Sequence, residues 1–160
     1  MVNIVIEVSK YLMILLIAAY TYWNFSYFRF RDPWQQGKVC VRQNVAMFLL
    51  HFVAYAVLFL KSEDERVILF YAAQVIFLAV YLGLYKVFYP LRSRLLVNNM
   101  CMLLCIGFVI LTRLDFDKAI RQFVIVAVSA LATWIIPFIM ERLWQLAKIP
   151  WVYGFAGLAL

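Results

Sequence analysis

Long apolar runs separated by short polar segments set the pattern of this chain. A helix needs about 20 mostly apolar residues to cross the roughly 30 Å of hydrocarbon in a bilayer. Six runs are candidates for such a crossing: residues 11–28, 44–60, 67–85, 95–112, 120–140 and 151–160. The first five are long enough to cross. The pattern therefore predicts an all-α fold, a polytopic membrane helix bundle with five full transmembrane helices and a truncated sixth.

The sixth run is short for a span. At 1.5 Å per residue, residues 151–160 reach about 15 Å, half the hydrocarbon thickness. A chain end at that depth would leave unpaired carbonyls and a charged carboxylate in lipid. We therefore expect the sequence to continue past Leu160.

Composition supports the membrane assignment. Of the 160 residues, 68% are hydrophobic and 14% are charged. A typical soluble domain is about 45–50% apolar and about 25% charged. So small a globule could not bury so much apolar surface, because small domains hide only about two-thirds of what the chain exposes. This excludes a soluble enzyme, a disordered tail and a nucleic-acid-binding module, so no nucleic-acid partner is expected.

The net charge of +7 predicts a direction across the membrane. Lys and Arg are enriched in cytoplasmic loops. The loops after the first, third and fifth runs carry nine Lys and Arg, whereas the other polar segments carry six. We therefore place those three loops in the cytoplasm and the N-terminus outside.

Polar side chains inside the second and third apolar runs are candidates for a functional role. His51 lies in the second run and Gln74 in the third. An ionisable group within the membrane is a functional candidate. The favoured interpretation is structural, because neutral imidazole and amide groups hydrogen-bond across helices. Between these runs, Ser62 and Glu65 have the spacing of a capping box that opens the third helix.

The cysteines do not suggest a metal site. Cys101 and Cys105 are four residues apart, which places them on one helix face. That run has no carboxylate, and His51 is the chain's one histidine. We expect no metal site and no cofactor.

The segment between the fourth and fifth runs combines acids and bases. Asp115 and Lys118 are three residues apart, and Asp117 and Arg121 are four apart, so each pair can meet on a helix. These contacts predict a cap with surface ion pairs. The alternative is that Arg113, Lys118 and Arg121 form a cationic rim that holds a phosphate-bearing lipid head group, because guanidinium matches phosphate oxygens.

The fifth run carries a polar face. Gln122, Ser129, Thr133 and Pro137 are separated by seven, four and four residues. In lipid, such a face must turn toward protein or a water-filled cavity. Ser129 and Thr133 are therefore candidates for packing or for lining a cavity, and Pro137 is a candidate kink.

These residues resemble a known family. The stretch Met102–Leu114, with the segment that follows to Gln122, looks like the first core helix and first outer loop of the FtsW/RodA/SpoVE proteins, the shape, elongation, division and sporulation (SEDS) family. The matching residues are Gly107, Arg113, Leu114, Ala119 and Gln122. Residues 150–160 resemble the start of the third core helix. The resemblance covers roughly residues 98–160, so residues 1–94 would be a three-helix extension and 95–160 the start of the core.

The resemblance implies a function. SEDS proteins of the bacterial plasma membrane polymerise lipid II, a lipid-linked disaccharide-pentapeptide, into peptidoglycan for cell division or cell shape. They work with a class B penicillin-binding protein and other divisome or elongasome membrane proteins. The family's catalytic Asp lies in a loop further along, so no catalytic residue is expected here. Substrate-binding candidates are Arg113, Lys118, Arg121 and Gln122, and cavity-lining candidates are Ser129 and Thr133.

Two other functions fit the same sequence. One is a small non-enzymatic membrane scaffold of the cell-elongation machinery, similar to MreD in size and hydrophobicity. The other is a small-solute transporter with His51 and Gln74 near its pathway.

Overall fold

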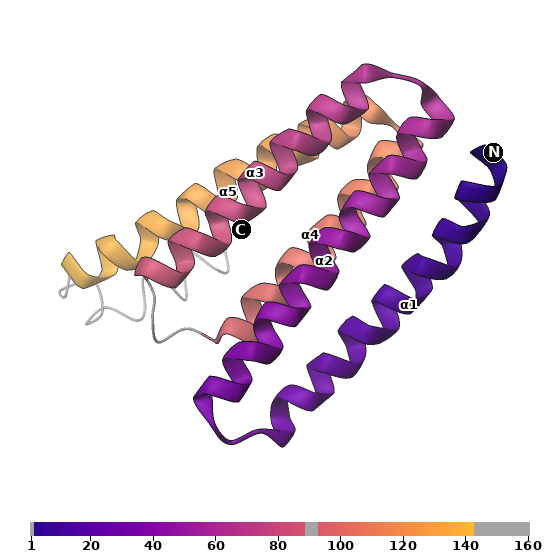
Figure 1. The fold of residues 1–160 in the computed structure, drawn as a ribbon. Helices are drawn as coiled ribbons and strands as arrows, with labels where there is room; N and C mark the ends of the chain where they lie inside the picture. Colours follow the sequence, from indigo (N-terminus) through magenta and orange to yellow (C-terminus); the bar gives the residue numbers. More distant parts are fainter. Residues whose placement is uncertain (1, 89–92, 143–160) are drawn as a thin grey trace, which may run out of the picture. The chain divides into compact units, whose positions relative to one another are not determined.

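The computed structural model describes the backbone of residues 2–88 and 93–142 and the side chains of residues 4–88 and 93–135. Within this part every regular element is an α-helix (Figure 1). The helices are α1 (Val2–Arg29), α2 (Pro33–Ser62), α3 (Glu65–Phe88), α4 (Arg94–Leu114) and α5 (Phe116–Arg142). The predicted sixth segment and the side chain of Pro137 lie outside the described residues.

All five helices are long and apolar enough to cross a membrane. The predicted all-α bundle with five full spans is confirmed to this extent, and the orientation of the N-terminus remains a prediction. The chain forms two compact units, residues 1–123 and 124–160. The domain boundary expected at 94/95 also remains a prediction.

The helices start and end outside the apolar runs that identify them. The largest difference is in α2, which begins at Pro33 rather than at Asn44. The Asp32 side chain accepts a hydrogen bond from the Trp34 N–H, and proline is tolerated in the first helical turn. At about 45 Å, α2 exceeds the hydrocarbon thickness, so its polar first turns need not lie in lipid.

The turn between α2 and α3 corrects the expected capping box. Asp64, not Ser62, caps α3, because Asp64 Oδ1 accepts from the Arg66 N–H at 2.9 Å. The Ser62 hydroxyl instead accepts from the Asp64 N–H at 3.4 Å. Glu63 between them adopts the left-handed conformation, with φ 52°, and ends α2. The capping-box prediction is wrong because Ser62 and Glu63 end α2, so Asp64 is the residue left to cap α3.

The turn between α4 and α5 consists of Asp115. Its N–H donates to the Leu111 carbonyl at 2.8 Å and so ends α4. Its carboxylate accepts from the Lys118 N–H at 3.0 Å and so begins α5. One residue therefore performs both caps, and the expected outer loop is shorter than the sequence indicated.

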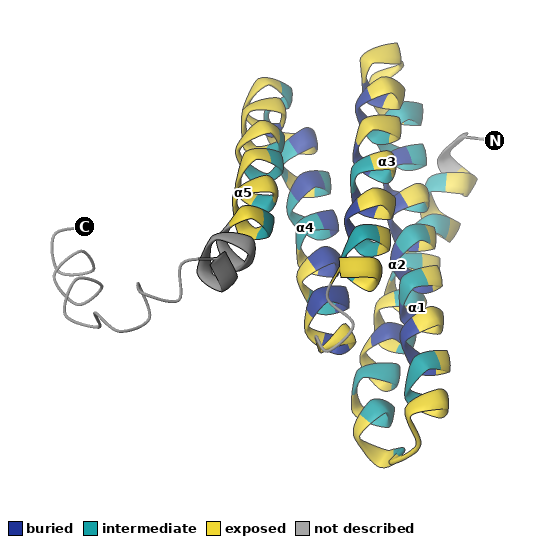
Figure 2. Ribbon diagram, turned by 90° about the vertical axis from the view of Figure 1, so that its left-hand side faces the viewer, coloured by how far each residue is buried: buried dark blue, intermediate teal, exposed yellow. Residues whose placement is uncertain are grey.

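Helix α2 is central to the first unit. It contacts α1, α3 and α4, and α1 runs antiparallel to it, whereas α4 runs in the same direction (Figure 1). Buried residues lie on the sides of the helices that face one another, and exposed residues on the outer sides (Figure 2). Many of these exposed side chains are large and apolar, as expected for a surface that meets lipid.

Polar side chains join the helices away from the caps. The Tyr20 hydroxyl of α1 donates to Asn99 Oδ1 of α4 at 2.9 Å. Next to it, the Asn98 amide donates to the Cys40 carbonyl and to Gln43 Oε1 of α2, both at 3.1 Å. In lipid such bonds hold helices together, because hydrophobic burial offers little net gain there.

Aromatic rings hold the first turns of α5 within the same unit. Phe70 of α3 makes edge contacts with Phe116 and Phe123, with ring centroids 5.4 and 5.7 Å apart. Ala119 lies between them with 0% exposure, in a buried cluster with Tyr55 and Phe70. A small residue at this position lets α5 approach closely.

Candidate functional site

Three cations from three helices border one groove. It has a volume of about 550 Å³ and lies between the first turns of α1 and the last turns of α2 and α4. The cations are Lys10 of α1, Lys61 of α2 and Arg113 of α4, and all three are exposed. We call this the basic groove. Its other lining residues are Ile6, Met13, Ala54, Val57, Leu58, Ser62, Val67, Val109 and Thr112.

The acids near the groove neutralise it only in part. Glu7 forms an ion pair with Lys10, with 2.6 Å between Oε1 and Nζ. Both side chains are more than half exposed, so the pair is weak. Within the described part of the chain, Lys61 and Arg113 have no carboxylate within ion-pair distance. The groove therefore keeps a net positive charge.

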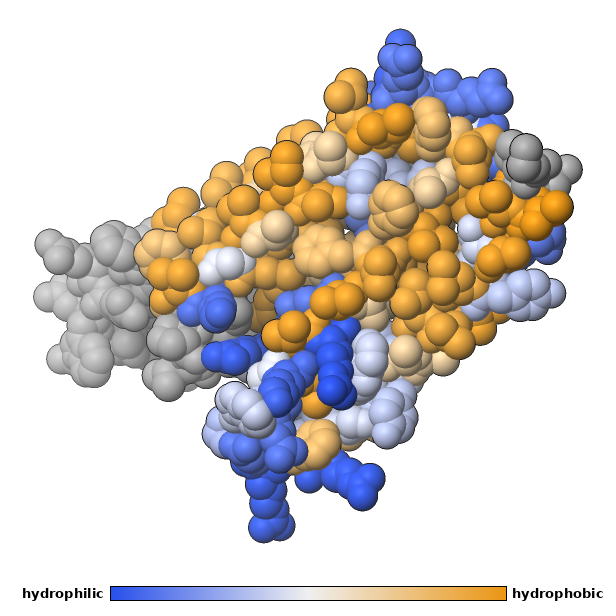
Figure 3. Space-filling view, viewed as in Figure 1, coloured by the Kyte–Doolittle hydropathy of each residue, from blue (hydrophilic) through white to orange (hydrophobic). Residues whose placement is uncertain are grey.

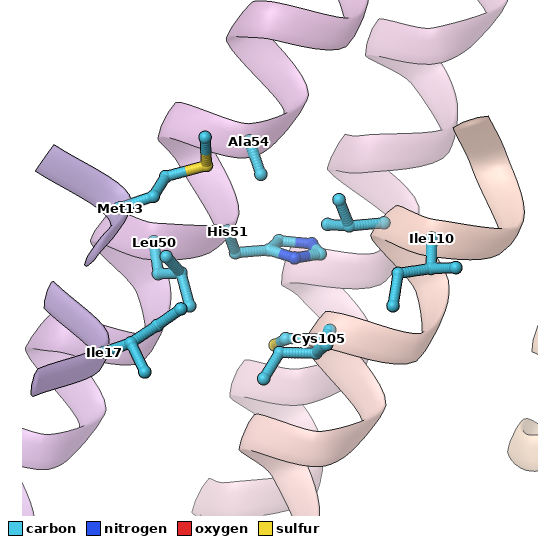
Figure 4. A pocket seen from close by; sticks show the side chains of 9 residues that line it. Met13, Ile17, Leu50, His51, Ala54, Cys105 and Ile110 are labelled. Carbon is cyan, nitrogen blue, oxygen red and sulfur yellow. The ribbon is translucent and has the colours of Figure 1, made fainter. Parts of the chain in front are cut away.

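A second pocket continues the groove toward the middle of the bundle. It has a volume of about 150 Å³ and is lined by α1, α2 and α4 (Figure 4). Met13, Ala54 and Val109 line both cavities, so the two adjoin each other at these side chains. Apart from His51 and Cys105, the lining of the second pocket is aliphatic or methionine.

His51 is 1% exposed, and its ring extends from α2 toward α4 between Cys105 and Ile110 (Figure 4). Neither ring nitrogen has a hydrogen-bond partner in the described part of the chain. The expected hydrogen bond to a neighbouring helix is therefore not formed. The ring instead contacts Tyr55 and Tyr71, with centroids 4.8 and 5.3 Å away.

Gln74 hydrogen-bonds to a neighbouring helix, as predicted, and its partner Tyr55 extends the contact to a third helix. The Tyr55 hydroxyl of α2 donates to Gln74 Oε1 of α3 at 3.0 Å, and it lies 2.8 Å from Thr112 Oγ1 of α4. The Thr112 hydroxyl also donates to the Phe108 carbonyl at 2.7 Å. We call Tyr55, Gln74 and Thr112 the polar junction.

The polar junction has more contacts than hydroxyl protons. Tyr55 and Thr112 carry one hydroxyl proton each, whereas three contacts need three donors. The Gln74 amide can supply the third proton if Nε2, which has no partner, turns toward Tyr55. In that orientation each of the three contacts has its own proton, donated from Gln74 to Tyr55, from Tyr55 to Thr112 and from Thr112 to the Phe108 carbonyl.

The three cations of the predicted rim do not all border the basic groove. Of its members, Arg113 lines the basic groove, whereas Lys118 pairs with Asp115, at 3.1 Å. The expected pair of Asp117 with Arg121 is not formed. Arg121 and Gln122 are exposed on α5 and do not line the groove.

The ion pair of Asp115 changes its titration. Hydrogen bonds from the backbone N–H and then the side chain of Lys118 hold the pKa of the Asp115 carboxyl below its usual value. Both partners are on the surface, so the pair acts as a cap rather than as a buried charge.

Ser129 and Thr133 lie on α5 in the second unit. Both are exposed, and the Thr133 hydroxyl donates to the Ala130 carbonyl at 2.8 Å. Their role in lining a cavity remains a prediction.

In the sequence, Lys10 and Lys61 are distinguished only as charges expected on the same side of the membrane as Arg113. Their convergence with Arg113 depends on α1 and α4 flanking the same end of α2, which a pattern along the chain does not encode. The one indication in the sequence is that the charge count places all three cations on the same side of the membrane. On the face seen in Figure 3, hydrophilic residues gather at the two ends of α2, with hydrophobic residues between.

These features define a class. Five apolar helices with polar ends are consistent with a multi-pass membrane protein. Comparison of the chain with protein-family models, curated proteins and solved structures found no match.

Proposed function

We propose that this chain is the amino-terminal part of a SEDS peptidoglycan glycosyltransferase. The complete protein would span the bacterial plasma membrane many times and polymerise lipid II beside a class B penicillin-binding protein. Helices α1 to α3 would be an extension, and α4 and α5 the first two core helices.

The observation that carries the proposal is the hairpin of α4 and α5, where the residues of the resemblance occur in order. Arg113 and Leu114 end α4, Asp115 makes the turn, and Ala119 follows in α5. Ala119 is fully buried in a helix contact, where a larger side chain would not fit, and this supports its match to the family pattern. Gly107 has open space where a Cβ would point, so packing gives its match no support.

The proposed substrate contacts lie around this hairpin. Arg113 borders the basic groove, and Lys118, Arg121 and Gln122 are exposed on the first two turns of α5. Guanidinium and ammonium groups at the membrane surface suit the phosphates of a lipid-linked sugar. Asp115, between Arg113 and Lys118, serves as a helix cap and is not among the proposed substrate contacts.

The test uses the full-length protein with its penicillin-binding partner and lipid II. We expect Arg121→Gln to lower the initial rate of glycan polymerisation roughly tenfold, the value of one charged hydrogen bond to phosphate. Lys86→Gln, an exposed cation at the far end of α3, should leave the rate unchanged. Equal rates for Arg121→Gln and the unmodified protein, at equal expression, would contradict the substrate contact.

A genomic observation separates the proposal from its rivals. We expect the gene to continue past codon 160 with further apolar spans and a long outer loop that contains an Asp. A stop codon directly after Leu160 would instead favour the MreD-like scaffold. Loss of solute flux in His51→Ala would favour the transporter.

A further inference from the structure

We propose that the basic groove holds one anionic phospholipid of the surrounding bilayer. Its phosphate would lie among Lys10, Lys61 and Arg113, and one acyl chain would follow the apolar floor toward Leu50. This proposal rests on the groove; it shares Arg113 with the proposed substrate contacts and assigns the groove itself to a lipid of the bilayer.

The charges of the groove select an anion. Three cations reach its rim from three helices, and Glu7 is the one carboxylate paired with them in the described part of the chain. Arg113 offers a planar fork that matches two phosphate oxygens, whereas Lys10 and Lys61 act as point charges. A zwitterionic head group would bring its own cation to the same rim, so its electrostatic attraction to the groove would be weaker.

The floor of the groove selects a molecule with an apolar chain. Apart from the cations, Ser62 and Thr112, the lining is aliphatic or methionine, as in Met13 and Val109, and the adjoining second pocket extends this apolar surface. A free phosphate ion would leave this surface empty. The ligand is therefore an amphiphile whose head and chain meet different parts of one cavity.

The depth of the cavity matches one leaflet of a bilayer. Along α2, Lys61 is eleven residues from Leu50, which is about 16 Å at 1.5 Å per residue. Half of the hydrocarbon thickness is about 15 Å. An acyl chain anchored by its phosphate at the surface reaches this depth. A polyprenyl chain is much longer than the cavity, so a bilayer phospholipid fits better.

The test measures phospholipid binding to the purified 160-residue chain. Phosphatidylglycerol and phosphatidylcholine with the same acyl chains are titrated into detergent micelles, and bound lipid is counted by native mass spectrometry. Each surface cation contributes about fivefold to the binding of an anionic lipid. We therefore expect phosphatidylglycerol to bind about 100-fold more tightly than phosphatidylcholine.

Charge removal in the groove should abolish this preference. In the triple variant Lys10→Gln, Lys61→Gln, Arg113→Gln, the two lipids should bind within about twofold of each other. If the variant keeps the preference of the unmodified chain, the proposal is wrong. Displacement of phosphatidylglycerol by a polyprenyl pyrophosphate at equal concentration would also overturn it, and would assign the groove to the lipid-linked substrate of the proposed function instead.

Two controls separate binding from folding and from net charge. The matched triple variant Arg42→Gln, Arg66→Gln, Lys86→Gln removes the same charge at exposed positions outside the groove, and it should keep the preference. Loss of preference in this control would contradict a specific site. Val109→Trp leaves every cation in place but fills the point where the two cavities meet, so both lipids should bind at least tenfold more weakly. Unchanged binding would refute the chain-binding floor.

Discussion

The polar junction offers a test of how the first unit is held together. Tyr55→Phe removes the hydroxyl that lies between Gln74 and Thr112 and keeps the ring, which contacts His51 and Tyr71. Gln74 is 0% exposed, so its amide would lose its partner without gaining water. A buried polar group without a partner costs about 1–3 kcal/mol.

The expected magnitude depends on which partner is removed. Interhelical hydrogen bonds in membrane proteins average about 0.6 kcal/mol, with a maximum near 1.7. We expect Tyr55→Phe to lower the free energy of unfolding by about 2 kcal/mol. We expect Gln74→Leu to cost under about 1 kcal/mol, because Tyr55 keeps Thr112 as a partner.

The two changes should not add. In the double variant both polar partners are gone, so no amide is left without a partner, and the total cost should be about 1 kcal/mol below the sum. The assay is reversible unfolding in mixed dodecyl maltoside and sodium dodecyl sulfate micelles, followed by far-UV circular dichroism. Tyr11→Phe, an exposed tyrosine of α1, is the control and should change stability by less than about 0.5 kcal/mol. Additivity within about 0.3 kcal/mol would refute the junction.

Three further predictions use the same assay. His51→Phe should raise the free energy of unfolding by about 1 kcal/mol, because it removes two buried ring nitrogens without partners; a loss of more than 1 kcal/mol would refute this. Asp115 has a lowered pKa in the folded state, so its stabilisation is present above its unfolded pKa of about 3.9 and is lost as pH falls through the lower folded pKa. Asp115→Ala should therefore flatten the acid limb of the stability–pH curve, and an unchanged limb would count against the cap. Ala119→Leu should cost about 1–3 kcal/mol by overpacking, whereas the exposed control Ala132→Leu should be near neutral; equal effects would contradict a tight contact at Ala119.

The five spans could be predicted from the sequence because apolar runs of this length have few other stable environments. Their ends could not, because helices extend through polar residues until a cap stops them. Lys38 was assigned to a loop but lies in the second turn of α2, where it stacks over Trp34 with 3.4 Å from Nζ to the ring centroid. The cap at Asp32 fixes this start, and apolar periodicity does not detect caps.

The candidate site was predicted in part. Arg113 was singled out from its position at the end of a span, and it does border a cavity. Its partners there are Lys10 and Lys61, which are 103 and 52 positions away along the chain. The three cations border one groove because α1 and α4 both pack against α2. Local spacing favoured Lys118 instead, and that side chain forms the local ion pair with Asp115.

The role of Gln74 was predicted without its partners. An amide within a span was expected to hydrogen-bond across helices, and it does so with Tyr55. The fourth apolar run ends at Thr112, and the hydroxyl of this residue completes the polar junction. Tyrosine and threonine count as apolar or neutral in a hydropathy pattern, so their polar ends are not seen until the helices are in contact.

The proposed function depends most on the direction of the chain across the membrane, because a lipid II polymerase would work outside the cell, where Arg113 and the start of α5 would then have to lie. Thiol labelling in intact cells tests this with two exposed positions at opposite ends of the first unit, Asp117 at the start of α5 and Gln35 at the start of α2. The natural cysteines are buried, which keeps the background low. We predict that a membrane-impermeant maleimide labels Asp117→Cys and leaves Gln35→Cys unlabelled until the cells are opened. Labelling of Gln35→Cys with protection of Asp117→Cys would place the basic groove in the cytoplasm and contradict the account.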